Sequence, residues 1–219
     1  MSVDPSVDVN PVILVGAGGQ CKSMLPIVAS QHRIAGLMVE DPAAIGREFC
    51  GLPMKYLDAD LPGLLNDFCF INAVGQTPIN NPHGRRGLFQ HLVSAGATIL
   101  TIQSRCAVVH GYLKMGAFIH DMAFVNMDAV IGQNTIINSG AIIEHDAQIG
   151  DHCHVCPGAV VLGGLQICDN VIIGAGSVVV QSIDKPGFYA GVPARQIVLP
   201  GTAPQIVLAS QMPPTGARN

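Results

Sequence analysis

The chain has 219 residues, of which 12% are charged, 49% are apolar and none is Trp. A formal net charge of −4 offers no basic surface for nucleic acid, so we expect no nucleic-acid partner. The length suits one large or two modest domains, and the scarcity of charge is typical of a chain built around an extended apolar core.

The sequence shows no export or membrane signal. No apolar run approaches the roughly 20 residues that span a bilayer, and the polar segment 1–10 lacks the order of a signal peptide. We therefore expect no membrane contact and a cytoplasmic location. Seven irregularly spaced cysteines favour reduced thiols. Cys153 and Cys156 flank His154, but the register described below turns Cys153 toward the core and Cys156 toward a corner, so we expect no metal.

The chain begins with a strand, a glycine turn and a helix. The apolar run 11–15 leads into Gly16-Ala17-Gly18-Gly19-Gln20, and residues 21–31 have a helical pattern despite Pro26. Small residues at such a turn let backbone N–H groups approach a phosphate at the positive end of the helix. The alternative is that these glycines only make a tight turn.

Two further apolar runs complete a parallel α/β unit. Residues 34–39 end in Glu40-Asp41, and residues 68–74 end in Gly75-Gln76. Acidic residues after the second strand of such a unit accept hydrogen bonds from a ribose or base, although an ordinary solvated turn is the alternative. With a helix over 85–94 and a last strand over 96–100, we predict a Rossmann-like nucleotide-binding domain over residues 1–98.

Beyond this domain the sequence repeats with a period of six. The aliphatic positions are Leu113, Ile119, Val125, Ile131, Ile137, Ile143, Ile149, Val155, Val161, Ile167, Ile173 and Val179. A second position of the repeat is regular as well. Counted from the aliphatic residue as the first, the fifth residue of most hexads is Ala, Ser, Thr or Cys. Neither a helix nor a free-standing strand has this period, whereas a solenoid with repeated corners does.

The hexads resemble those of left-handed parallel β-helix acyltransferases, in which three hexads form one 18-residue coil. A glycine-rich start at Gly16, Gly75 after the third strand, the segment 140–146, and Phe188 to Arg195, which resembles a closing G-V-P-A-[KR], together resemble the sugar acyltransferase family. Its members include sialic acid O-acetyltransferases and bacterial nucleotide-sugar N-acetyltransferases. Two departures stand out, since Gln20 replaces the family's His and residues 103–106 replace H-P-S-A. The resemblance implies a β-helix domain over 99–198, followed by a tail over 199–219.

The hexad that begins at Ile143 carries the candidate catalytic residues. Its register places Glu144, His145 and Asp146 outside the core, and Gly163 and Gly164, one coil later, leave space beside them. An imidazole with a neighbouring carboxylate is suited to remove a proton near neutral pH. The family resemblance implies that His145 is the general base and that Asp146 raises its basicity, while the alternative is an ordinary surface histidine.

Acetyl-coenzyme A and a threefold assembly are implied by the same resemblance. His154 lies half a coil from His145 and should not meet it within one chain, but packing of three prisms would bring a neighbour's His154 to the groove, where the resemblance implies that it contacts acetyl-coenzyme A. The alternative is an exposed corner. We add Gly174, Ala175 and the cation Arg195 as further candidates for coenzyme A binding. The two remaining solenoid histidines, His120 and His152, are expected to be surface residues.

We therefore expect a homotrimeric, acetyl-coenzyme A-dependent N-acetyltransferase acting on a nucleotide-linked amino sugar, most simply a UDP-4-amino sugar for surface glycans. The substrate-binding candidates are Gly18, Gly19 and Gln20 for the sugar phosphate, Glu40 and Asp41 for the ribose or base, and Gly75 for close approach. The alternatives are O-acetylation of a sugar hydroxyl and a non-catalytic trimeric scaffold or nucleotide sensor. The outward-facing set at Glu144 to Asp146 argues against a scaffold.

Overall fold

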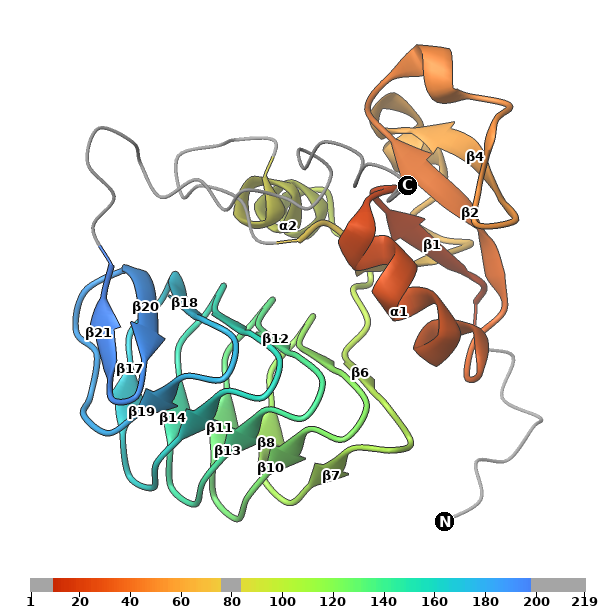
Figure 1. The fold of residues 1–219 in the computed structure, drawn as a ribbon. Helices are drawn as coiled ribbons and strands as arrows, with labels where there is room; N and C mark the ends of the chain where they lie inside the picture. The colour runs from red at the N-terminus through yellow and green to blue at the C-terminus, as the bar shows by residue number, and fades with distance from the viewer. Residues whose placement is uncertain (1–9, 76–83, 198–219) are drawn as a thin grey trace, which may run out of the picture.

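A computed structural model describes residues 10–75 and 84–197, so the tail expected over 199–219 lies outside the described residues. The structure has an N-terminal α/β part and a prism of stacked coils (Figure 1). No helix within those two ranges is long and apolar enough to cross a membrane. The division at residues 98 and 99 remains a prediction.

The N-terminal part is a five-stranded sheet in the order β3-β4-β2-β1-β5. Its elements are β1 (Val12–Val15), α1 (Gly19–Ala29), β2 (Ile34–Val39), η1 (Pro42–Ala44), β3 (Glu48–Phe49), β4 (Leu52–Leu57), η2 (Asp58–Gly63), β5 (Cys69–Asn72) and α2 (Arg85–Ser94). Three of the expected strands form as β1, β2 and β5 and pair in parallel, whereas the last strand expected over 96–100 forms only an isolated bridge between Ile99 and Phe70. The pair β3 and β4 was not expected, because Pro53 and Lys55 interrupt the apolar pattern of β4.

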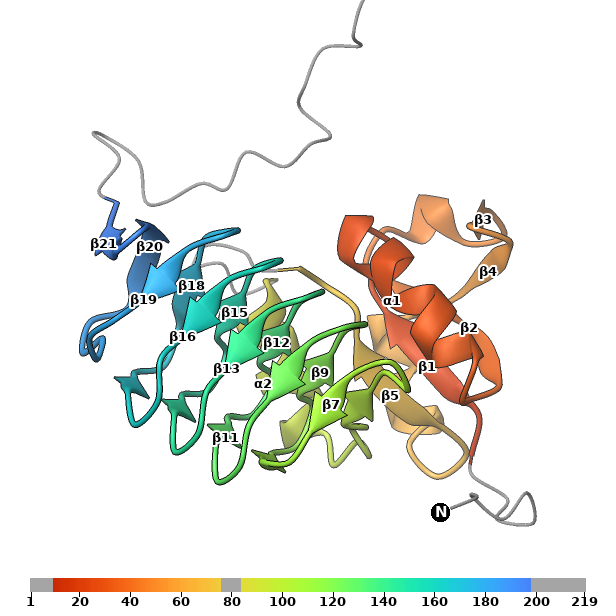
Figure 2. The ribbon, with the colours of Figure 1, turned by 60° about the horizontal axis from the view of Figure 1, so that its bottom comes forward.

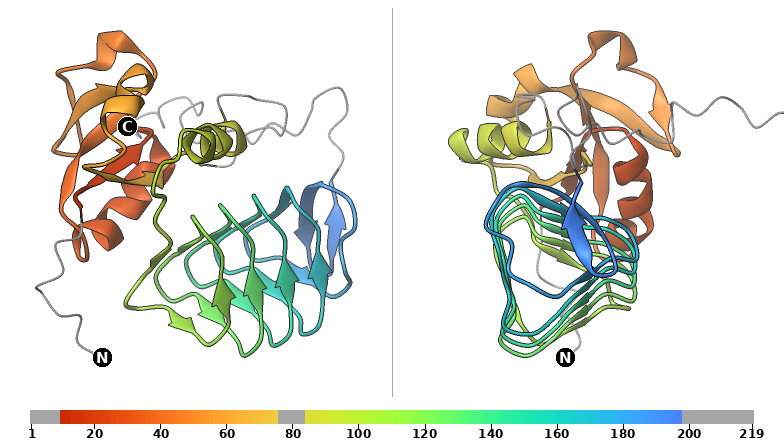
Figure 3. Two further views of the ribbon diagram at one scale, coloured as in Figure 1. Left: turned by 180° about the vertical axis from the view of Figure 1, so that it is seen from behind. Right: turned by 60° about the vertical axis from the view of Figure 1, so that its left-hand side comes forward.

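The hexads form the left-handed parallel β-helix that the sequence predicts, seen along its axis in Figure 3 and from below in Figure 2. Face 1 consists of β7 (Val108–Val109), β10 (Phe124–Val125), β13 (Ile142–Ile143), β16 (Val160–Val161) and β19 (Val178–Val179). Face 2 consists of β8 (Tyr112–Leu113), β11 (Val130–Ile131), β14 (Gln148–Ile149) and β17 (Gln166–Ile167). Face 3 consists of β6 (Ile102–Gln103), β9 (Phe118–Ile119), β12 (Ile136–Ile137), β15 (His154–Val155), β18 (Val171–Ile173), β20 (Gly187–Gly191) and β21 (Ala194–Gln196).

The register explains the core of the prism. Within the regular hexads from Leu113 to Val179 strand partners are 18 residues apart, as in the pairing of Ile137 with Val155, so each aliphatic position stacks on its equivalent in the next coil. The small positions are buried beside them, with Ala141 and Ala159 fully enclosed. Each coil therefore buries its apolar face against its neighbours, as expected for a solenoid.

The N-terminal part packs on the outer side of face 3, and α2 lies along the solenoid (Figures 1 and 3). Outward side chains of the first coils, such as Phe118 and Ile136, share one apolar cluster with α1 and β1. Arg85 is 1% exposed and donates hydrogen bonds to the backbone oxygens of Asn72, Val74 and Asn134. These contacts hold the two parts in one arrangement.

The expectation that His120 and His152 are surface residues is wrong for His120 and incomplete for His152. His120 is 2% exposed, and its Nε2 lies 3.1 Å from Nε2 of Gln20. His152 is half-buried, contacts Phe89 edge to face and bonds Asn134. Both lie where the N-terminal part covers face 3, a contact that the hexad pattern alone does not reveal.

Candidate active site

His145 and Asp146 form an exposed pair at the corner between faces 1 and 2. His145 Nδ1 donates to Asp146 Oδ2 over 2.8 Å, and both side chains are 64% exposed. The hydrogen bond to Asp146 raises the pKa of His145, with a smaller contribution from the charge of Glu144. Because Nδ1 carries the proton that Asp146 accepts, Nε2 keeps its lone pair and is the basic atom.

Gly163 forms the surface on which the imidazole rests. A Cβ at Gly163 would lie 2.8 Å from both Cε1 and Nε2 of His145, so any side chain there would displace the ring. The neighbouring Gly164 adopts φ +70°, and its N–H donates to the oxygen of His145 over 2.8 Å. The expected space beside the pair is thus present, and the ring itself occupies the part nearest Gly163.

Glu144 turns away from the other two members of the set. Its Oε2 accepts a hydrogen bond from Asn126 Nδ2 over 2.8 Å, one coil earlier. Asp146 has φ +61°, a left-handed conformation that places its carboxylate beside the histidine ring. At this corner Asp146 therefore bonds the His145 ring, whereas Glu144 bonds Asn126 of the preceding coil.

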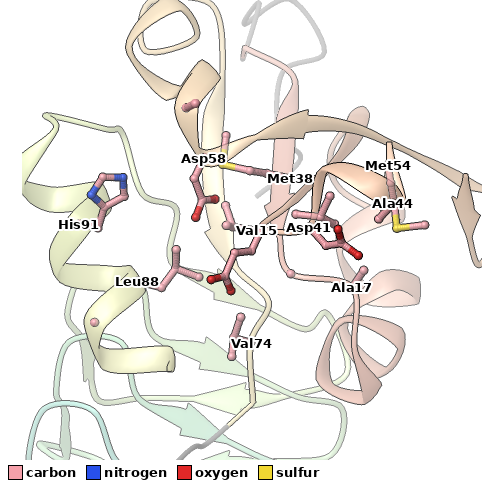
Figure 4. Close-up of a pocket in the computed structure, with 15 residues that line it drawn as sticks. Val15, Ala17, Met38, Asp41, Ala44, Met54, Asp58, Val74, Leu88 and His91 are labelled. Atoms are coloured by element: carbon pink, nitrogen blue, oxygen red, sulfur yellow. The ribbon is translucent and has the colours of Figure 1, made fainter. Parts of the chain in front are cut away.

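A cavity of about 760 Å³ lies at the carboxyl ends of the N-terminal strands. It is lined by Val15, Gly16, Ala17, Met38, Val39, Glu40, Asp41, Ala44, Met54, Asp58, Ala59, Val74, Gly87, Leu88 and His91. Figure 4 shows the carboxylates of Asp41 and Asp58 and the ring of His91 around this space. We call it the strand-end pocket. Parallel α/β sheets bind ligands at this edge.

The glycine turn borders the strand-end pocket. Gly16 has φ +109°, and a Cβ there would lie 2.8 Å from a methyl of Val74. Close packing against Val74 therefore explains why a glycine stands at this position. Gly18 and Gly19 have no atom within 4 Å of an added Cβ; Gly18 is the N-cap of α1, and Gly19 is its first residue. Gly75 lies against Gln20, with 3.4 Å from its built Cβ to the Cβ of Gln20.

The structure brings some of the predicted substrate residues together and separates others. Glu40 and Asp41 line the strand-end pocket with Gly16 and Ala17, next to Gly18 and Gly19 in the chain. Asp58 and His91 also line it and were not expected from the sequence. Asp58 follows β4, the strand that the apolar pattern missed, and His91 reaches the pocket only through the placement of α2.

His154 lies on face 3, away from His145 at the corner of faces 1 and 2, as the half-coil spacing predicts. It is 9% exposed and not an open corner, and burial lowers the pKa of its ring to about 3. Its Nε2 contacts Asn138 Nδ2 at 3.2 Å, while Nδ1 has no hydrogen-bond partner among the described residues. A neutral ring at this place can exchange hydrogen bonds but cannot buffer protons near neutral pH.

The three remaining candidates lie near the closing end of the solenoid. Gly174 is buried, and a Cβ there would lie 2.9 Å from that of Ala190, so packing under β20 accounts for this glycine. Ala175 and Arg195 are exposed, and Arg195 Nη1 bonds the oxygen of Ala194. Their roles toward coenzyme A remain predictions. In the described part of the chain no three His, Cys, Asp or Glu side chains converge as a metal site.

Comparison with known proteins finds similar repeats and similar solved structures. The model of the bacterial transferase hexapeptide (six repeats) matches residues 128–163 and 146–181. No curated protein sequence matches the chain. A GDP-perosamine N-acetyltransferase from Caulobacter crescentus, solved with CoA and GDP-perosamine, has a TM-score of 0.70 and 25% identity over 88% of this chain and 99% of its own.

Two further structures share the fold at lower identity. The acetyltransferase domain of PglB from Neisseria gonorrhoeae has a TM-score of 0.71 and 22% identity, covering 86% of this chain and 100% of its own. WeeI from Acinetobacter baumannii has a TM-score of 0.58 and 20% identity, covering 85% and 99%.

The repeats and the exposed histidine corner thus define a hexapeptide-repeat transferase. The likeness to the Caulobacter enzyme extends over both the α/β part and the solenoid, so the chain is similar to this sugar acetyltransferase over most of its length.

Proposed function

We propose that this protein transfers an acetyl group from acetyl-coenzyme A to the amine of a nucleotide-linked amino sugar, with His145 as general base. The observation that carries the proposal is the His145 ring, bonded through Nδ1 to Asp146 and seated over Gly163, which leaves room for Cε1 and Nε2. A scaffold or sensor would not need a glycine at position 163, where the absence of a side chain makes room for the His145 ring. The likeness to an enzyme that acetylates GDP-perosamine supports the same reaction class.

The chemistry follows from this arrangement. The sugar amine attacks the thioester carbonyl, and Nε2 of His145 takes the proton that the nitrogen loses as the new C–N bond forms. Collapse of the tetrahedral intermediate breaks the C–S bond, and the imidazolium returns the proton to the leaving thiolate. Asp146 stabilises the imidazolium between these two steps, so no covalent acyl-enzyme is needed.

The strand-end pocket is the proposed nucleotide site. Backbone N–H groups at the start of α1 suit the diphosphate. Among the described residues that line the pocket, only His91 can carry positive charge, whereas Glu40, Asp41 and Asp58 offer acceptors. Carboxylates accept hydrogen bonds from the hydroxyl and N–H groups of the ribose and base but repel phosphates. The lining of the pocket therefore suits the nucleoside part of the ligand.

The same acceptors favour guanine over the uracil expected from the sequence. Guanine presents two adjacent donors, N1–H and the N2 amino group, which one carboxylate accepts together, whereas uracil presents one N–H between two carbonyls. The similar Caulobacter enzyme was solved with a GDP-linked sugar. Calorimetry should therefore give tighter binding of GDP than of UDP.

Three copies are proposed to form the complete site. Face 1 presents an outward row of apolar side chains, Val108, Phe124, Ile142, Val160 and Val178. Val108 is 46% exposed, and Met122 at the edge of this row is 77% exposed. Because His145 and the strand-end pocket lie on different sides of one prism, a second copy packed on face 1 would bring them together. Light scattering of an active sample should give a trimer.

The decisive experiment is thiol release from acetyl-coenzyme A, followed across a panel of GDP- and UDP-linked sugars with either an amine or a hydroxyl at the same carbon. Turnover with amino sugars supports the proposal. Turnover only with hydroxyl sugars would favour O-acetylation, and no turnover with any of them would favour the non-catalytic alternative.

A further inference from the structure

The contact between Gln20 and His120 joins the glycine turn to the solenoid across 100 residues of sequence. Gln20 is the second residue of α1, directly after Gly18 and Gly19, while His120 follows β9 at the corner between faces 3 and 1. The two Nε2 atoms lie 3.1 Å apart. This is the point where a sugar extending from the strand-end pocket past the start of α1 would meet the solenoid.

The chemistry of the contact fixes the proton positions. The amide nitrogen of Gln20 can only donate, so Nε2 of His120 must accept and the imidazole must be neutral with its proton on Nδ1. Burial lowers the pKa of His120 to about 4, against the opposing effect of Asp121, so the ring is neutral at pH 7. The ring also packs on Phe118, with centroids 4.8 Å apart, which holds its plane.

This contact also orients the other half of the amide. Because Nε2 of Gln20 is directed at His120, the oxygen Oε1 is turned away from it. Among the described residues, the side chain of Gln20 makes no other hydrogen bond. Gly75 adds no side chain beside it, and Gly18 and Gly19 leave open space before it. The result is a half-buried carbonyl acceptor held in one direction at the rim of the nucleotide site.

We propose that Oε1 of Gln20 accepts a hydrogen bond from the reacting amine of the sugar and that His120 is the positioning residue that holds the amide in this orientation. The inference rests on the proposed function and assigns a substrate contact within it. An acceptor at the amine leaves the nitrogen lone pair free to face the thioester. It also explains why a buried, uncharged histidine is kept at the interface, since its lone pair selects one orientation of the amide over its flipped form.

A double-mutant cycle tests the pair, using thiol release from acetyl-coenzyme A with GDP-perosamine as acceptor. Gln20→Ala should lower kcat/KM for the sugar by about 5–15-fold, the worth of one hydrogen bond, with KM for acetyl-coenzyme A unchanged. His120→Phe should lower kcat/KM by a similar factor. Because His120 acts through Gln20, adding His120→Phe to Gln20→Ala should cost less than twofold more.

Two controls separate positioning from packing. His120→Gln supplies an acceptor at about the place of Nε2 and should restore most of the activity that His120→Phe loses. His152→Phe removes another histidine of the same interface, one that bonds Asn134 and does not contact Gln20, and should leave kcat/KM within twofold of wild type. Thermal unfolding of all variants checks that they fold.

The outcomes are distinguishable. If the losses in kcat/KM of the two single variants multiply in the double variant, or if Gln20→Ala leaves kcat/KM unchanged, the proposed roles of Gln20 and His120 are wrong. The proposed function would then still stand. A wild-type enzyme that fails to acetylate any amino sugar nucleotide would overturn the proposed function and the role of the pair with it.

Discussion

Adding one methyl group at Gly163 tests the active-site geometry most directly. In Gly163→Ala the new Cβ would lie 2.8 Å from Cε1 and Nε2 of His145, short of the 3.4 Å at which ordinary contact begins. The alanine backbone is not strained, because Gly163 is not among the glycines with positive φ. The ring is exposed and can swing outward, so the free energy of unfolding should change by less than about 0.5 kcal/mol.

Catalysis should respond far more than stability. The ring must move by at least 0.6 Å to restore contact at 3.4 Å, and a misplacement of about 1 Å can cost on the order of 100-fold in rate. We expect kcat to fall by about 10–100-fold. Movement also lengthens the 2.8 Å bond to Asp146, the main cause of the raised pKa of His145. The pKa should therefore fall toward its ordinary value, and the acidic limb of the kcat profile should move to lower pH.

The assay is thiol release at saturating substrates between pH 5 and 9. Gly63→Ala is the matched control, because this glycine, unlike Gly163, has open space around an added Cβ and lies outside the strand-end pocket. A Gly163→Ala enzyme with wild-type kcat and an unshifted pH profile would refute the assignment of His145 as the base over Gly163.

The remaining predictions concern the base, the domain interface and the acceptor. His145→Ala should lower kcat by about 10²–10⁴-fold, and Asp146→Asn by a smaller factor with the acidic limb shifted to lower pH; an unshifted limb would show that the carboxylate does not act on the ring. Arg85→Met leaves the backbone oxygens of Asn72, Val74 and Asn134 without their donor, so urea unfolding should show a loss of about 3 kcal/mol or more; a loss under 1 kcal/mol would contradict this role. Amino sugars should react at least about 10-fold better in kcat/KM than matching hydroxyl sugars, equivalent to about 1.4 kcal/mol; the reverse preference would favour O-acetylation.

The prism and the outward position of His145 could both be predicted from the amino-acid sequence. A strict period of six admits one register, since a shift by one residue would turn polar corners into the core, and coils of 18 residues place Gly163 beside His145 without further information. The strands β1, β2 and β5 could be predicted equally well, because each lies in a run of mostly apolar residues.

How the N-terminal part meets the solenoid could not be predicted from the sequence and follows from packing in three dimensions. The bond of Gln20 to His120 spans 100 residues, that of Asn72 to Asn134 spans 62, and that of Arg85 to Asn134 spans 49. Neither partner of such a pair carries a local signal, since a histidine after a strand has the same sequence pattern whether water or another domain covers it. The burial of His120 and His154, and the arrival of Asp58 and His91 at one pocket, follow from packing between surfaces that periodicity cannot pair.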